Sequence, residues 1–233
     1  FRKESVLSTK SKVGIAHTRW ATHGTVTRDN THPFTSCDGS FAVVHNGIIS
    51  NYRFLRDGLK GEGHVFRSDT DTEVIPHLLE KYYQKYENVE KALVKTLNIL
   101  EGTFAIAVIS TYHPDQIFCA RRESPLMIGI GDELKFVGSD FNAFIDYTKN
   151  AIIMEDDEYA ILSRDSYVVK NFLTQEEVVK AITKIEWDSE TAKKAGYPHY
   201  MLKEIYEQPQ TINTALELDS GLMDEMVDLI DTS

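Results

Sequence analysis

Two short apolar runs near the start of the chain have the pattern of buried strands. Residues 13–17 (VGIAH) and 41–45 (FAVVH) are rich in apolar and β-branched residues, and each ends in a histidine followed by polar residues. Apolar runs of this length between polar segments favour strands over helices. We therefore expect two buried strands, each with a loop at its carboxyl end.

A helical period follows residue 73, where apolar and aromatic positions recur three and four residues apart. These positions are Val74, Leu78, Leu79, Tyr82, Tyr83 and Tyr86. Thr70 and Glu73 fit a capping box at the start of this helix. Pro76 falls in the first turn, where a missing N–H costs little. A second amphipathic helix is predicted over 89–100.

From residue 103 the pattern becomes one of short strands separated by turn residues. The strand patterns are TFAIAVIS (103–110), QIFCARR (116–122), PLMIGIG (125–131), LKFVGS (134–139), EYAILS (158–163) and SYVVKN (166–171). A helix is expected at 140–147. Hairpin-linked strands after two helices predict an α+β domain of two sheets with helices on the outer faces.

The character changes again near residue 187. A polar stretch there predicts a linker, which leads to a helix interrupted at Pro209. The acidic segment 218–233 carries an apolar stripe at helical spacing that would need a partner. We expect residues 1–190 to form one domain and 191–233 to be a connector toward a further domain.

Composition narrows the class of protein. The 233 residues contain 25 Lys+Arg against 36 Asp+Glu, a net charge of −11, which argues against binding to nucleic acid or an anionic membrane. The apolar runs are far too short to span a bilayer. Cys37 and Cys119 form no disulfide framework, so a reducing, cytoplasmic location is expected. Because the sequence begins at Phe1 and not at Met, we expect its natural start to lie upstream.

The first cluster of residues suited to binding or catalysis is HTRWATHG at residues 17–24. It places a guanidinium (Arg19), an indole (Trp20), a hydroxyl (Thr22) and an imidazole (His23) in one loop. Arginine is the natural bidentate partner of a carboxylate. The alternative is a surface loop with a snorkelling arginine and a core tryptophan, and the pattern alone leaves both open.

Two further clusters follow, HNGII at 45–49 and SDTDTE at 68–73. Asn-Gly is typical of a hairpin turn, although the residues after Ile49 look like an incoming helix. In the functional interpretation, the Asn46 amide and the Gly47 N–H are two neutral donors for one developing oxyanion. The acids of the third cluster are either helix-dipole partners or include an aspartate that holds a ligand ammonium.

A fourth motif, HYMLKEIYEQP, lies at 199–209. The three clusters and this motif, in this order, resemble the glutaminase domain of the glutamine–fructose-6-phosphate aminotransferases (glucosamine-6-phosphate synthases). Each motif alone is weak, but the four together are specific and cover residues from about 13 to 217. The phosphoribosyl-pyrophosphate amidotransferases resemble the chain in the first two clusters. They are not expected to carry the Trp-Ala-Thr-His loop or the KEIYEQP segment.

The resemblance implies an N-terminal-nucleophile hydrolase fold, a four-layer αββα sandwich. In that family the thiolate of an amino-terminal cysteine attacks the glutamine carboxamide, and its own α-amine is the general base, with a pKa near ~7.7–8.0. The ammonia would pass to fructose 6-phosphate in an isomerase domain of a homodimeric enzyme of amino-sugar biosynthesis. No cofactor is implied.

The resemblance also assigns residues. Arg19 would bind the glutamine α-carboxylate, with Thr22 and His23 lining the same end, and Asp71 would accept from the α-ammonium. Asn46 (side chain) and Gly47 (backbone N–H) would form the oxyanion hole. Trp20 would lie in the loop that closes over glutamine.

The chain departs from the family at its start, because the Cys-Gly-Ile that opens the family's mature sequence is not in it. Neither Cys37 nor Cys119 can supply an amino-terminal amine, so this chain alone is not expected to hydrolyse glutamine by that mechanism. One alternative is a module that binds glutamine without cleaving it. Another is a metal protein, but the histidines that cluster in the sequence match no common ligand spacing, so no metal is expected. They are His17, His23, His32 and His45.

Overall fold

The structure is a computed structural model that describes residues 11–18, 27–185 and 197–216. The chain divides into two compact units, Phe1–Ile185 and Glu186–Ser233, which are considered separately.

The first unit contains three α-helices, one 3-10 helix and ten strands among its described residues. The helices are α2 (Tyr52–Gly61), α3 (Val74–Tyr86), α4 (Val89–Leu97) and η1 (Phe141–Ala143). The strands are β1 (Phe34–Thr35), β2 (Phe41–Ile49), β3 (Gly102–Ser110), β4 (His113–Arg122), β5 (Met127–Ile130), β6 (Lys135–Gly138), β7 (Asn150–Ile153), β8 (Glu158–Leu162), β9 (Tyr167–Asn171) and β10 (Thr183–Lys184).

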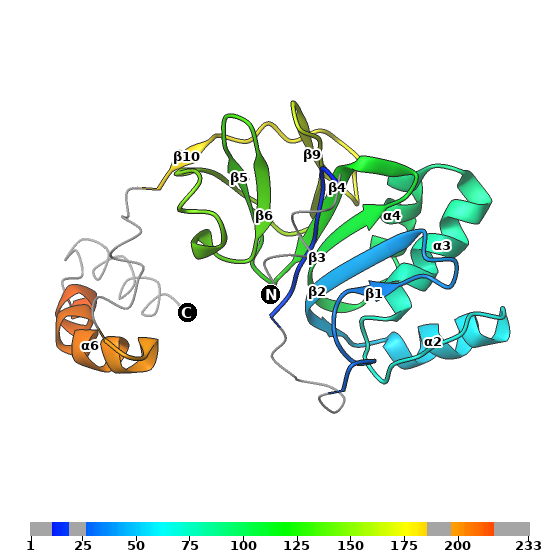
Figure 1. Cartoon of the computed structure of the whole chain (residues 1–233), viewed down its shortest axis with the longest axis horizontal. Coiled ribbons are helices and arrows are strands. Elements are labelled where there is room, and N and C mark those ends of the chain that lie inside the picture. The colour runs from blue at the N-terminus through cyan, green and yellow to red at the C-terminus, as the bar shows by residue number, and fades with distance from the viewer. Residues whose placement is uncertain (1–10, 19–26, 186–196, 217–233) are drawn as a thin grey trace, which may run out of the picture. The chain divides into compact units, whose positions relative to one another are not determined.

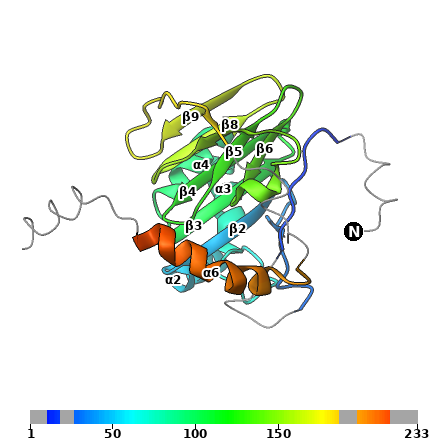
Figure 2. The same cartoon turned by 90° about the vertical axis from the view of Figure 1, so that its left-hand side faces the viewer.

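These strands form two antiparallel sheets. The larger sheet has the order β1-β2-β3-β4-β8-β9, and the smaller has the order β10-β7-β5-β6. Helices α2, α3 and α4 gather beside the larger sheet, whereas the smaller sheet lies on its other side (Figure 1). Figure 2 shows the larger sheet in a view turned by 90°, with β2, β3, β4, β8 and β9 in this order.

The alternation of side chains along β3 explains this layering. Phe104, Ile106 and Val108 belong to the core shared with the helices, whereas Ala105 belongs to the core between the sheets. Successive side chains of a strand point to opposite faces, so a strand buried on both faces is apolar throughout. The layers therefore follow one another as helices, then the large sheet, then the small sheet. This arrangement confirms the predicted α+β domain of two sheets.

The two apolar runs at the start of the chain behave differently. Residues 13–17 lie among the described residues and form no strand there, so that prediction is wrong. The run at 41–45 is a strand, but β2 continues through the Asn-Gly pair to Ile49. The hairpin interpretation is therefore wrong, and α2 begins at Tyr52 as the incoming-helix pattern indicated.

The six strand patterns after residue 103 are all confirmed, whereas the helix at 140–147 is not. Only a single 3-10 turn, η1, forms there, begun by Asp140, whose side chain accepts from the Asn142 N–H at 2.7 Å. Phe144 then packs on the small sheet, where its ring occupies the space that a Cβ on Gly129 would need. This segment is held by packing on the sheet and not by helical periodicity.

The second unit contains α6 (Tyr200–Leu216). This helix continues through Pro209, so the interruption predicted there is wrong. The predicted linker at 187–196 and the amphipathic segment 218–233 fall outside the described residues. Among the helices that the structure describes, none is long and apolar enough to cross a membrane.

Candidate functional site

The carboxyl end of β2 approaches β3 at two glycines. Gly47 has a φ of +124°, and a Cβ there would lie 2.2 Å from the Thr103 carbonyl oxygen. Gly102, opposite Ile49, has a φ of +101°, and its Cβ would lie 2.2 Å from the Ile48 oxygen. Positive φ and backbone contact together restrict both positions to glycine. The Asn-Gly pair thus allows a close approach of two strands and makes no turn.

Asn46 has its side chain fixed by a residue of the first motif. Nε2 of His17 lies 2.6 Å from Oδ1 of Asn46. A carboxamide oxygen only accepts, so the imidazole N–H donates and the amide NH₂ keeps its own donors. Asn46 is an exposed residue. The His17 ring in turn packs on His32, with ring centroids 4.1 Å apart.

The acidic corner at 68–73 is attached to the same end of β2. The Ile49 N–H donates to Oδ2 of Asp71 at 2.7 Å, and Nδ1 of His45 lies 2.9 Å from the Thr72 hydroxyl. Burial lowers the pKa of His45, and the nearby Asp71 carboxylate opposes this effect. The structure therefore brings three predicted site residues to one end of one strand. They are Asn46, Gly47 and Asp71.

Glu73 supports this corner, but not through the predicted capping box. Its carboxylate accepts from the N–H groups of Arg67 and Ser68, each at 2.8 Å, and from the Ser68 hydroxyl at 2.7 Å. Thr70 makes no such cap, because its hydroxyl pairs with Ser68 at 2.9 Å. Burial alone would raise the pKa of Glu73, but its contact with His77 and these donors lower it to about 2.

The remaining predicted site residues lie outside the described residues: Arg19, Trp20, Thr22 and His23. The segments that flank them are described. On one side His17 contacts Asn46, and on the other the Asn30 side chain accepts from the Asp69 N–H at 2.9 Å. Both flanking segments are thus attached to the two motifs that form the site.

A cavity of about 300 Å³ opens at this place, within the usual range for small-ligand sites. His17, His45 and Asn46 line it together with apolar residues of both sheets and of the loops next to them. The apolar part comprises Ala105, Ile106, Ala107, Leu126 and Val137.

The chain's two cysteines are not part of this cavity. Cys119 is buried in β4, and burial raises the pKa of its thiol to about 12, so it stays protonated. Cys37 is exposed in the loop between β1 and β2. Among the residues that the structure describes, the one group of converging metal-ligand atoms contains Cys37 and none of the predicted site residues.

Comparison with known families places these motifs in context. The model of the glutamine amidotransferase domain family matches residues 17–146, more than half of the chain. This match begins at the first motif and includes β2 and the acidic corner. The chain belongs to the glutamine amidotransferase domain family.

Similar proteins refine that assignment. The chain is 51% identical to a glutamine–fructose-6-phosphate aminotransferase (isomerizing) of Thermococcus kodakarensis over 214 residues, which cover 92% of this chain and 36% of that protein. Identity to the proteins of the same name from Pyrococcus horikoshii and Methanothermobacter thermautotrophicus is 46% and 45%, with the same coverage. The resemblance drawn from the motifs is confirmed. The chain spans about a third of the length of these relatives.

Two solved structures share the fold. One is the glutamine phosphoribosylpyrophosphate amidotransferase from B. subtilis in complex with ADP and GMP, with a TM-score of 0.57. The other is described as the allosteric regulatory enzyme of purine biosynthesis, with a TM-score of 0.58. Each is 25% identical to this chain and covers 67% of it, whereas the chain covers 34% of each.

Proposed function

We propose that this chain is the glutamine-hydrolysing part of an enzyme that transfers the glutamine amide nitrogen to fructose 6-phosphate and forms glucosamine 6-phosphate. The observation that carries the proposal is the meeting of Asn46, Gly47 and Asp71 at the end of β2 in a glutamine amidotransferase domain. The names of the similar proteins support the choice of acceptor.

In the proposed reaction, the amino-terminal cysteine thiolate used by the family attacks the carboxamide carbon of glutamine. Ammonia leaves, and water then hydrolyses the thioester to glutamate. Negative charge develops on the carboxamide oxygen during the attack, and the Asn46 NH₂ and the Gly47 N–H would stabilise it. The contact from His17 supports this role, because it directs the NH₂ end of the Asn46 amide away from the imidazole.

Recognition of free glutamine would depend on its two charges. Asp71 uses one carboxylate oxygen for the Ile49 N–H, and the other would accept from the α-ammonium group. Arg19 would bind the α-carboxylate from the loop whose flanks are attached to this corner, with Thr22 and His23 beside it. Trp20 would close over the substrate. A glutamine side chain within a protein lacks both charges and would be rejected.

The rest of the assignment extends beyond the described residues. We expect the αββα sandwich of the family, with a second helical layer beyond the small sheet. Residues 1–190 would be the glutaminase domain, and 191–233 the connector to an isomerase domain in a cytoplasmic homodimer.

The test is glutamate release from glutamine by the full-length protein, measured beside a variant in which the amino-terminal cysteine is changed to alanine. We expect release in the first and none in the second, and glucosamine 6-phosphate when fructose 6-phosphate is added. Asn46→Ala should lower kcat about 10²–10³-fold.

Release equal to that of the cysteine variant would refute the proposal. Calorimetry with glutamine then decides the alternative, because binding without release identifies a glutamine-binding regulatory module.

A further inference from the structure

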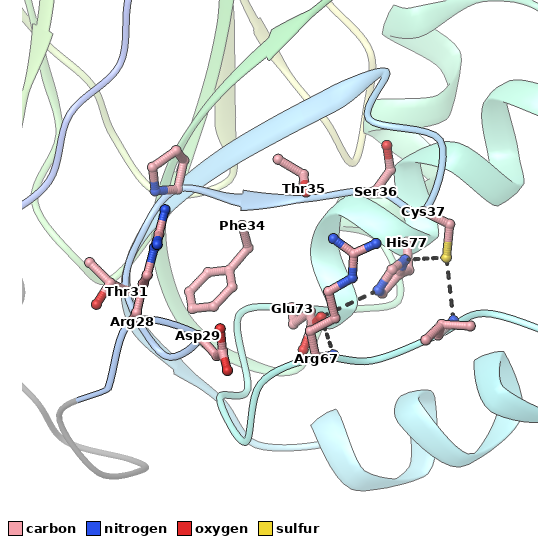
Figure 3. A pocket seen from close by; sticks show the side chains of 12 residues that line it. Arg28, Asp29, Thr31, Phe34, Thr35, Ser36, Cys37, Arg67, Glu73 and His77 are labelled. Carbon is pink, nitrogen blue, oxygen red and sulfur yellow. Dashed lines mark hydrogen bonds and ion pairs between the residues drawn. The ribbon is translucent and has the colours of Figure 1, made fainter.

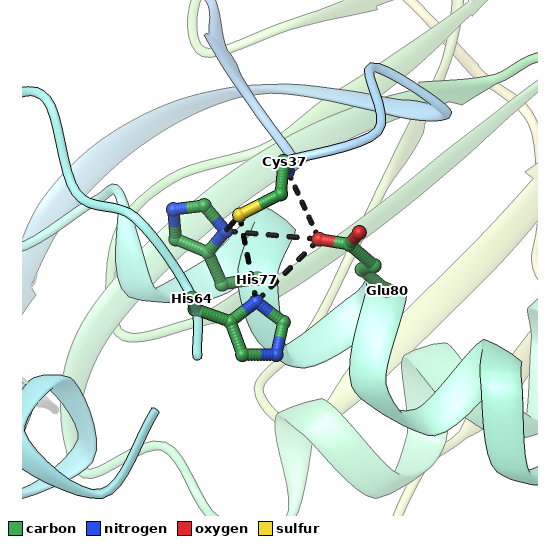
Figure 4. A group of neighbouring side chains, drawn as sticks. All are labelled: Cys37, His64, His77 and Glu80. Carbon is green, nitrogen blue, oxygen red and sulfur yellow. Dashed lines mark hydrogen bonds and ion pairs between the residues drawn. The ribbon is translucent and has the colours of Figure 1, made fainter. Parts of the chain in front are cut away.

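Four side chains with metal-ligand atoms converge at a place separate from the glutamine site. They are Cys37, His64, His77 and Glu80. Cys37 comes from the loop between β1 and β2, and His64 from the segment after α2, whereas His77 and Glu80 lie three residues apart on α3 (Figure 4). Residues with this spacing share one face of a helix.

The distances among these atoms suit a tetrahedral metal ion. Sγ of Cys37 lies 3.5 Å from Nδ1 of His77 and 3.8 Å from Nδ1 of His64. Oε2 of Glu80 lies 3.5 Å from Nδ1 of His64 and 3.8 Å from Nδ1 of His77. Around a zinc ion with bonds of 2.0–2.3 Å, neighbouring ligand atoms are about 3.3–3.6 Å apart. These four distances lie within a few tenths of an ångström of that range, and all four ligand atoms lie within 4.8 Å of one another.

Direct hydrogen bonding accounts for the two contacts of the thiol, which are within the longer range of sulfur, but less well for the two contacts of the carboxylate. An N–H···O bond spans about 2.7–3.2 Å, and both carboxylate-to-imidazole distances exceed that range. Both imidazoles nevertheless direct the same nitrogen, Nδ1, at the thiol and at the carboxylate. That geometry is expected when the four atoms surround a common centre.

The groups around the four ligands hold them in place. The Cys37 Sγ accepts from the Val65 N–H at 3.3 Å, and Oε2 of Glu80 accepts from the Cys37 N–H at 2.9 Å. On the far side of the His77 ring, Nε2 lies 3.7 Å from Oε1 of Glu73. At this distance the contact is not a hydrogen bond. A carboxylate that accepts from a histidine ligand is a common support in zinc sites, and Glu73 would take this role if the contact shortened on metal binding.

Charge and access also fit. A thiolate and a carboxylate together neutralise a divalent cation, so a partly buried site would carry no net charge. Cys37 and His77 border a cavity of about 130 Å³ that also reaches Val65, Arg67 and Glu73 (Figure 3). This cavity offers a path by which an ion reaches the ligands.

We propose that Cys37, His64, His77 and Glu80 bind one zinc ion in a closed, structural site. The ion would join the β1–β2 loop, the segment after α2 and helix α3. Through Glu73 it would also stabilise the acidic corner that carries Asp71. All four ligands come from the protein, which is typical of structural and not catalytic zinc. The proposal does not depend on the glutaminase assignment.

The test is metal content and cobalt spectroscopy of the protein purified without chelator and then equilibrated with zinc or cobalt. We expect one equivalent of zinc per chain. The cobalt form should show a thiolate-to-metal charge-transfer absorption and the strong d–d bands of a tetrahedral centre. Cys37→Ser should abolish the charge-transfer absorption, and His64→Gln should weaken zinc binding at least about tenfold.

His113→Gln is the matched control, because this exposed histidine is outside the cluster; it should bind zinc like the parent. A chelator should lower the Tm of the parent and of this control but not that of Cys37→Ser. Zinc content well below one equivalent in the parent would overturn the proposal, and so would equal binding by the parent and both ligand variants. The cobalt spectrum of the parent tests the proposed site even if a variant fails to fold.

Discussion

At the scale of single residues, the structure tightly constrains Gly47. A Cβ there would collide with the Thr103 carbonyl, and its φ of +124° is one that L-residues rarely adopt. We expect Gly47→Ala to lower the free energy of unfolding by more than about 3 kcal/mol, because conformational strain and displacement of β3 add together. Chemical denaturation measures the loss.

The control for this prediction is Gly39→Ala. Gly39 also has a positive φ, +72°, but a Cβ there would meet nothing within 4 Å. Gly39→Ala should therefore lower the free energy of unfolding by only about 1 kcal/mol, the cost of the left-handed conformation. Equal losses in the two variants would contradict the close approach of β2 and β3.

His17 is a positioning residue for Asn46, and a second prediction follows from their 2.6 Å contact. His17→Ala should lower kcat for glutamine hydrolysis roughly 10- to 10²-fold, because the Asn46 amide is then free to rotate. The KM should change little. His17→Gln should recover part of the activity, since a carboxamide NH₂ can also donate to Oδ1. A change confined to KM would assign His17 to substrate binding instead.

At this scale, the sequence predicts those site residues whose role can be recognised from the motif that contains them. Asn46, Gly47 and Asp71 stand in motifs, and the structure brings them together. The partners that fix them come from elsewhere in the chain: His17 for Asn46, Thr103 for Gly47. Cys37 and His64 are 27 positions apart, so no ligand spacing reveals the proposed zinc site.

At the scale of elements, Glu90 joins α4 to the larger sheet. Its Oε1 accepts from the Tyr159 hydroxyl of β8 and from Nζ of Lys170 in β9, each at 2.7 Å. Burial alone would raise the pKa of Glu90, but hydrogen bonds from Lys170 and Tyr159 and the charge of Lys170 lower it below its usual value of 4.5. The ionised carboxylate is thus favoured in the folded state.

This gives a pH-dependent prediction for Glu90→Gln. Because the folded-state pKa is depressed, the stabilisation is complete above the usual pKa of 4.5 and is lost as the pH falls below it. The variant should be less stable than the parent at pH 7, by at most about 1 kcal/mol for a partly exposed pair. The difference should shrink toward pH 3, as thermal denaturation across this range would measure.

The exposed Glu133, changed to Gln, serves as the control and should show no such trend. A Glu90→Gln deficit that is unchanged between pH 7 and pH 3 would show that shape and not charge holds α4 to the sheet.

Elements with strong periodicity were predictable, and elements held by tertiary contacts were not. The helix at 74–86 and the six later strand patterns carry their own signal. β1 and β10 are two residues each and exist only through pairing with β2 and β7. Residues 140–147 look helical in isolation, but Phe144 packs beside Gly129 and the segment follows the sheet.

For the whole molecule, the layered core lies within the first unit. The three groups of packed apolar side chains draw only on residues between Phe41 and Ile185. Strand alternation and hairpin spacing predicted the two sheets. The pairing order, with β8 beside β4 and β7 beside β5, depends on contacts between distant segments that no local pattern encodes.

A final prediction concerns how much of the chain glutamine binding needs. Every predicted site residue falls in the unit Phe1–Ile185, as do these packed groups. A chain ending at Ile185 should therefore fold and bind glutamine with a Kd within about twofold of that of the 233-residue chain, as measured by calorimetry. The same truncated chain with Asp71→Asn should bind more weakly, because the ammonium group loses its charged partner. Binding by the longer chain alone would mean that residues after 185 complete the site, and the glutaminase unit would then have to include them.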